Sequence, residues 1–108
     1  MKEFPKGVDD SNKNEYEAWR MKNPRGFIVN AIRSPRTRMW TLHTAGCHMV
    51  QYKMHTPPKE KRKPKICCEN VNEVAQVIAA NKGAPFLPLA SCYKCRNKLG
   101  EARKLVKP

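Results

Sequence analysis

Two groups of residues in this chain have side chains that bind metal ions in proteins. The segment LHTAGCH contains His43, Cys47 and His48, and the segment CYKC contains Cys92 and Cys95. A C-x-x-C pair places two thiolates on one turn, at the reach that a tetrahedral metal requires. A strand end followed by a turn can offer the nitrogen of His43 and the sulfur of Cys47 to the same ion. The sequence therefore predicts one structural Zn²⁺ ion with the ligands His43, Cys47, Cys92 and Cys95.

The sequence leaves the fourth ligand open. Cys67 and Cys68 are adjacent on a predicted strand, so their side chains point to opposite faces and only one of them can readily join the site. Cys67 could replace His43 as a ligand. His48 could also replace it, or the site could hold no zinc. We expect Cys68 to be an ordinary buried thiol, because free cysteine packs as a small hydrophobic residue.

Catalysis by the same residues is disfavoured. A Cys/His nucleophile needs an orienting third group and an oxyanion hole, and neighbours in sequence seldom align for proton transfer. No Asp or Glu lies between Ala18 and Lys59, which removes paired-carboxylate catalysis and the acidic ligands that Mg²⁺ prefers. A closed set of four protein ligands leaves no open position for a substrate. We therefore expect a domain without enzymatic activity.

The charge of the chain points to a polyanionic partner. Lys and Arg number 22 against 9 Asp and Glu, a formal net charge of +13. Such an excess attracts nucleic acid most commonly, and we expect DNA rather than RNA. An acidic protein partner is the alternative. The candidate contacts lie in a predicted hairpin loop and in a basic segment further on: Arg33, Arg36, Arg38, Lys59, Lys61, Arg62, Lys63 and Lys65.

The expected compartment is the cytoplasm. No apolar run approaches the roughly 20 residues that span a bilayer, and the segment MKEFPKGVDD lacks the apolar stretch of a signal peptide. In a reducing cytosol, five cysteines favour metal ligation or free thiols over a disulfide framework.

The elements that must position these residues form a small α+β domain. Residues 14–23 predict a short helix, and residues 26–32 and 38–43 predict the two strands of a β-hairpin. Residues 65–68 predict a short third strand. The expected architecture is a small antiparallel sheet, made of the hairpin and the third strand, with two or three helices and the zinc site.

The second half of the chain supplies the remaining helices. Residues 69–83 predict a helix that Asn70 caps, with Glu73 three residues later. Residues 96–106 predict a C-terminal helix, which the zinc would join to the hairpin.

The predicted organisation is one folded unit with two loose segments. We expect residues 1–13 to form a flexible leader and residues 14–108 to form a single zinc-stabilised domain. A mobile basic loop is expected at residues 56–65.

Three segments together resemble a known module: YEAWRMKNPRGFIVNAIRSPRTRMWTLHTAGC, KICCENVNEVAQVIAAN and CYKC. The pattern is G-[FY]-[VI]-[VL]-N, R-S-P, L-H-x-x-x-C, [KR]-[IV]-C and C-x-x-C, as in an uncharacterised small bacterial and phage zinc-binding module found alone or beside nuclease-like or restriction-associated domains. The resemblance covers residues 15–96 and implies a prokaryotic or phage protein with a shared metal site. The basic loop at 57–65 and Cys68 depart from the pattern and leave the partner open. The polar landmarks of the module fall on His43, Cys47, Cys67, Cys92 and Cys95.

Overall fold

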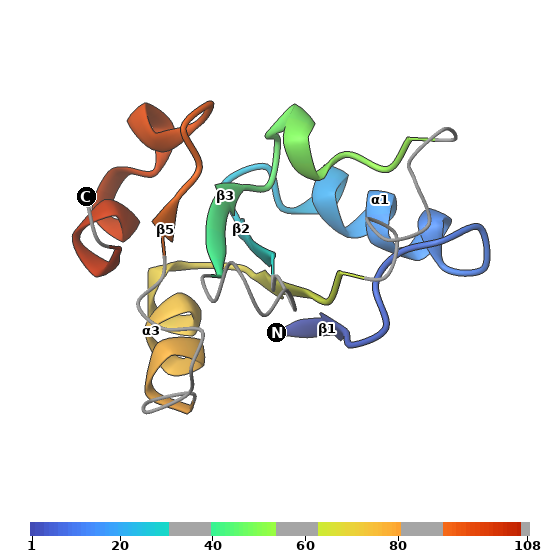
Figure 1. Cartoon of the computed structure of the whole chain (residues 1–108), viewed down its shortest axis with the longest axis horizontal. Helices are drawn as coiled ribbons and strands as arrows, with labels where there is room; N and C mark the ends of the chain where they lie inside the picture. Colours follow the sequence, from blue (N-terminus) through green and yellow to red (C-terminus); the bar gives the residue numbers. More distant parts are fainter. Residues whose placement is uncertain (31–39, 54–62, 81–89, 107–108) are drawn as a thin grey trace.

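The centre of the computed structural model is a sheet of four antiparallel strands, to which a short fifth strand adds in parallel (Figure 1). The structure describes residues 1–30, 40–53, 63–80 and 90–106. The order of the strands across the sheet is β1–β4–β2–β3–β5. Their bounds are Lys2–Phe4 (β1), Phe27–Asn30 (β2), Thr41–Thr44 (β3), Lys65–Cys68 (β4) and Ala90–Ser91 (β5). The predicted α+β class, with its hairpin and third strand, is confirmed.

Within the described residues, two α-helices accompany the sheet, close to the predicted positions. Helix α1 spans Lys13–Lys22 and helix α3 spans Val71–Ala80. The predicted cap of α3 is present, since the side-chain oxygen of Asn70 accepts a hydrogen bond from the backbone N–H of Glu73 at 3.0 Å. The Glu73 carboxylate in turn accepts one from the backbone N–H of Glu69 at 2.9 Å. Within the described part of the chain, no helix is both long and apolar enough to cross a membrane.

The two faces of the sheet are covered by different helices. Cys67 and Cys68 are neighbours on β4, so their side chains point to opposite faces. Tyr16 of α1 lies on the Cys67 side, where its ring packs edge-on against Phe4 with the ring centroids 5.4 Å apart. Helix α3 contacts β2 and β4 on the Cys68 side. Figure 1 shows α1 and α3 on opposite sides of the sheet. Because both faces are covered, β2 is apolar at three consecutive positions.

The start of the chain differs from the predicted flexible leader. Lys2–Phe4 forms β1, which pairs with β4 in antiparallel register, with Lys2 opposite Cys67. Phe4 and Val8 are both part of the buried core. The physical reason is the free edge of β4, which the N-terminal segment covers while it contributes an aromatic ring to the core.

The C-terminal segment is helical, but it is not the single helix predicted for residues 96–106. It forms two short 3₁₀ helices, η2 at Arg96–Lys98 and η3 at Gly100–Leu105. Gly100 adopts a left-handed backbone conformation with φ of 57°, which interrupts a regular helix. Leu99 and Ala102 of this segment are nevertheless buried.

Candidate metal centre

The parallel pairing of β3 and β5 brings the two predicted halves of the metal site together. The backbone N–H of Cys92, directly after β5, donates a hydrogen bond to the carbonyl of Leu42 on β3 at 3.0 Å. Parallel strands end at the same edge of a sheet, so Cys92 lies beside the end of β3, where His43 is found. Cys47 follows in the turn after β3, where its backbone N–H donates a hydrogen bond to the carbonyl of Thr44 at 3.1 Å. The CYKC turn then adds the last thiol.

The four predicted ligands form one buried cluster. One ligand atom from each of them lies within 4.8 Å of all the others, and the sulfurs of Cys47 and Cys92 are 3.9 Å apart. Zinc–sulfur bonds of about 2.3 Å in tetrahedral geometry require sulfurs about 3.8 Å apart, so this spacing fits one ion. The four residues are His43, Cys47, Cys92 and Cys95.

Backbone amides support two of the sulfurs. The N–H of Thr44 donates to Cys95 Sγ and the N–H of Lys94 donates to Cys92 Sγ, both at 3.4 Å. The same bonds fix the orientation of the sulfurs before a metal arrives.

His43 carries the clearest sign that the cluster serves a ligand. Its side chain is 5 % exposed, and neither ring nitrogen has a hydrogen-bond partner within the described residues. An unpartnered polar group in the interior costs free energy, and a metal ion on one nitrogen would remove that cost for the nitrogen it binds. Burial, together with the nearby charge of Lys65, lowers the pKa of His43 to about 4. The imidazole is therefore neutral at physiological pH, which is the form that binds metal.

Cys67 does not belong to the cluster, which groups His43 with three other cysteines. Ile28 on β2 is the cross-strand partner of both His43 and Cys67, one on each side. Strands lie about 4.8 Å apart, so two intervals separate the backbones of His43 and Cys67 by about 10 Å. His43 therefore lies within the cluster and Cys67 lies outside it. His48 begins the 3₁₀ helix η1 (His48–Val50) and is exposed, outside the cluster. Cys68 is a buried thiol on the other face, as expected.

Arg20 of α1 holds the turn that carries Cys47, a role that the sequence alone did not reveal. Its Nε donates to the carbonyl of Ala45 at 2.7 Å, and its Nη2 donates to the carbonyl of Cys47 at 3.2 Å. Glu17, one turn earlier on α1, pairs with the same guanidinium. The spacing of Glu17 and Arg20 on a helix is visible in the sequence. The carbonyl to which Arg20 donates, however, lies more than twenty residues away along the chain.

Most of the predicted nucleic-acid contacts lie outside the described residues. Of the two that the structure describes, Lys63 is half-buried and Lys65 is only 9 % exposed. Lys65 lies in β4, where its Nζ donates to the side-chain oxygen of Asn30 at 2.6 Å and to the carbonyl of Lys63 at 3.2 Å. The prediction that Lys65 belongs to a mobile, exposed loop is therefore wrong. The residues outside the described part are Arg33, Arg36, Arg38, Lys59, Lys61 and Arg62.

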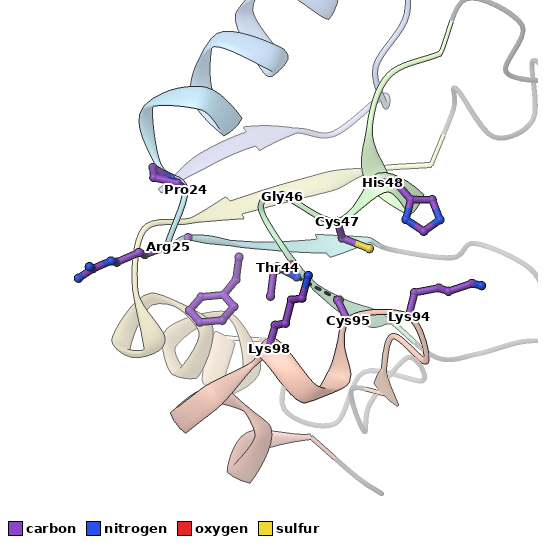
Figure 2. Close-up of a pocket in the computed structure, with 11 residues that line it drawn as sticks. Pro24, Arg25, Thr44, Gly46, Cys47, His48, Lys94, Cys95 and Lys98 are labelled. Carbon is purple, nitrogen blue, oxygen red and sulfur yellow. Dashed lines mark hydrogen bonds between the residues drawn. The ribbon is translucent and has the colours of Figure 1, made fainter.

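A cavity of about 430 Å³ lies next to the cluster and is bordered by two of its sulfur residues, Cys47 and Cys95. Arg25, Lys94 and Lys98 also border it, and Figure 2 shows the side chains of Arg25 and Lys94 pointing outward in opposite directions. Sequence reasoning missed this cavity, because its basic residues come from segments far apart in the chain and carry no common motif.

The arrangement could hold one metal ion, and three thiolates with one imidazole are compatible with a structural zinc. Every donor comes from the protein and all four residues are buried. Comparisons with family models, with curated proteins and with solved structures give no significant match to this chain, so the resemblance to the small bacterial module stays a prediction.

Proposed function

We propose that this protein is a non-enzymatic zinc domain that binds nucleic acid, with double-stranded DNA as the preferred form. The observation that carries the proposal is the closed and buried ligand set at the end of β3. Its four residues are between 3 % and 5 % exposed. A catalytic zinc keeps one position open for water or substrate, whereas a structural zinc is enclosed by four protein ligands.

The metal would act as a fastening between two parts of the chain. Cys92 and Cys95 flank the turn before η2, and His43 and Cys47 belong to the end of β3 and the turn after it. Among the described residues, the backbone hydrogen bonds between these two parts are those of the short β5 and the one from Cys92 to Leu42. Removal of zinc is therefore expected to loosen the C-terminal segment from the sheet.

The charge of the chain supports nucleic acid as the partner. With a net charge of +13, the protein produces a positive field that concentrates polyanions. Two carboxylates on α1 already form ion pairs, Glu15 with Lys2 and Glu17 with Arg20. None of the described residues that line the cavity is acidic.

A salt titration of binding to DNA tests the proposal. Fluorescence anisotropy with a mixed-sequence duplex is expected to show binding at ~50 mM salt and a steep linear fall of log affinity with log salt concentration, because bound cations release counterions from DNA. A duplex and a single strand of the same sequence, measured in parallel, test the preference for double-stranded DNA.

Absence of binding to either form at ~50 mM salt would contradict the nucleic-acid proposal. An acidic polypeptide of matched charge serves as the control. If it binds as tightly as DNA, the alternative of an acidic protein partner is favoured. Enzymatic activity that disappears on His43→Ala while the fold survives would contradict the non-enzymatic part.

A further inference from the structure

Two of the three sulfur residues in the metal cluster border the cavity beside it. Cys47 and Cys95 line this cavity of about 430 Å³, whereas Cys92 is not among the described residues that line it. Its wall also includes Gly46 and His48, which are both exposed, so solvent enters it (Figure 2). A water molecule takes up roughly 30 Å³ in the liquid, so a peroxide of two oxygen atoms fits into the cavity.

The surroundings of this wall favour attack on a thiolate. A cysteine that binds zinc is held as a thiolate, which is the form that a peroxide attacks. Reactive cysteines are typical of electropositive surroundings, and none of the described residues that line the cavity is acidic. Cys67 and Cys68 are fully buried and do not line the cavity. Oxidation is therefore expected to begin at the cavity and not at these two thiols.

Cys92 lies where a second sulfur is needed to form a disulfide. Its Sγ is 3.9 Å from the Sγ of Cys47, although the two residues are 45 positions apart in the chain. Both side chains already point to one centre, since one ligand atom from each cluster residue lies within 4.8 Å of all the others. A disulfide requires sulfurs about 2.05 Å apart, so side-chain movements over about 2 Å are enough to join them.

We propose that Cys47 is an oxidation site and that Cys92 is its resolving partner. A peroxide transfers one oxygen to the Cys47 sulfur, which becomes a sulfenic acid, while the O–O bond breaks and the other oxygen takes up protons and leaves as water. The Cys92 sulfur then attacks the Cys47 sulfur. The S–S bond forms, the S–O bond breaks, and the oxygen leaves as a second water. The two cysteines lose two electrons, which the peroxide gains.

Oxidation in this way replaces one fastening with another. His43 and Cys95 are then the only donors left of the four, and two donors do not retain zinc. The disulfide joins the turn after β3 to the segment after β5, which are the parts that the metal joins. In a reducing cytosol such a disulfide is transient, as is typical of a redox sensor. The inference rests on the zinc of the proposed function and is independent of nucleic acid.

Hydrogen peroxide, added to the zinc-loaded protein, tests the oxidation site. Released zinc is measured with a chromogenic indicator, and free thiols are counted after denaturation. One zinc per chain is expected to leave while two of the five thiols disappear, and dithiothreitol with added zinc should restore both. Cys67→Ala is the matched control, since it removes a buried thiol outside the cluster, and its rate of zinc release should change less than about twofold.

Tryptic peptides identify the bridged pair. Trypsin cleaves after Lys94, which separates Cys92 in peptide 83–94 from Cys95 in peptide 95–96, and Cys47 lies in peptide 39–53. A disulfide between peptides 39–53 and 83–94 is expected. A disulfide that contains Cys95, or sulfinic acid on Cys47 without a disulfide, would overturn the proposal. Dimedone traps sulfenic acids, and it should label Cys47 when it is added with the peroxide. A label on Cys95 alone would overturn the assignment of Cys47.

Gly46→Leu tests the route through the cavity. Gly46 lines the cavity, and a Cβ atom built on it would meet no other atom within 4 Å, so a side chain can be added there. The variant is expected to bind one zinc per chain and to release it at least about threefold more slowly under peroxide. Zinc release at the rate of the wild type would overturn access through the cavity.

The oxidation site and the proposed function fail in different ways. If the reduced protein binds no zinc, the proposed zinc domain is overturned, and peptide mapping alone decides whether Cys47 and Cys92 form a disulfide. If zinc binds but peroxide releases none, or if peptides 39–53 and 83–94 stay unlinked, the oxidation site is overturned while the zinc domain stands.

Discussion

His43 and Cys67 lie in one cross-strand row of the sheet, and Ile28 separates them. Ile28 pairs with His43 on one side and with Cys67 on the other. The three side chains therefore share a face, but only His43 lies on the strand that borders β5 and the CYKC turn. Cys67 is instead fully buried under α1, close to Tyr16, and burial raises its pKa to about 12. Cys47 has a pKa raised in the same way, so it is the position of Cys67, outside the group of ligand atoms that lie within 4.8 Å of one another, that separates Cys67 from the cluster.

Gly26 should be intolerant of any side chain. A Cβ atom at this position would come within 2.8 Å of the Cys68 carbonyl oxygen and 2.9 Å of the Trp19 ring. Because the first contact is with backbone, it cannot be relieved by a rotamer change. Gly26→Ala is expected to lower the free energy of unfolding by about 1–3 kcal/mol, measured by urea denaturation of the zinc-loaded protein.

Gly46→Ala is the matched control for Gly26→Ala, because its Cβ atom meets open space. It should change the free energy of unfolding by less than about 0.5 kcal/mol. Equal destabilisation by the two substitutions would show that the packing described around Gly26 is incorrect.

Arg20 should contribute to metal affinity without being a ligand. Its guanidinium bonds the carbonyls of Ala45 and Cys47 at once, which fixes the turn that presents the Cys47 sulfur. Arg20→Lys keeps the charge but loses the planar guanidinium that donates both hydrogen bonds. Zinc affinity is therefore expected to fall about tenfold in a competition titration with a chelator. Lys22→Ala, at the end of the same helix, is the control and should leave the affinity unchanged. Equal affinities of wild type and Arg20→Lys would contradict the positioning role.

Proton release on zinc binding should come from the thiols and not from the imidazole. Burial raises the pKa of Cys47 to about 12, so this thiol is protonated at pH 7.5 and must lose its proton to bind metal. The pKa of His43 is lowered to about 4, so its imidazole is already neutral. Zinc affinity therefore rises with pH, and the stability that zinc supplies is lost as the pH falls.

Calorimetry in buffers of different ionisation enthalpy counts these protons. Cys47→Ala is expected to release about one proton fewer than the wild type, and His43→Ala is expected to release the same number. A lower count for His43→Ala would mean that the imidazole is protonated before zinc binds, which contradicts its described environment.

Local signals in the sequence predicted the parts of the fold that depend on neighbouring residues. The run KICC predicted β4 with its bounds, and Asn70 with Glu73 predicted the start of α3. The spacing of Cys92 and Cys95 predicted half of the metal cluster for the same reason, since two ligands on one turn meet through local geometry alone.

Features that depend on distant pairing could not be predicted in this way. The segment of β1 is polar in composition, and only its pairing with the edge of β4 makes it part of the sheet. The choice of His43 over Cys67 depends on the strand order, because both residues lie on the same face. Lys65 was counted both in the predicted third strand and in the predicted basic loop, although the alternation within KICC places it on the same face as Cys67 and so favours the strand.

The zinc ligand set is tested most directly by X-ray absorption at the zinc edge of the purified, zinc-loaded protein. The account predicts one zinc per chain with three sulfurs at about 2.3 Å and one imidazole nitrogen at about 2.0 Å. Cys67→Ala should give the same spectrum, because Cys67 lies outside the cluster. A shell of four sulfurs in the wild type, with one sulfur lost in Cys67→Ala, would contradict the central claim that His43 is the fourth ligand.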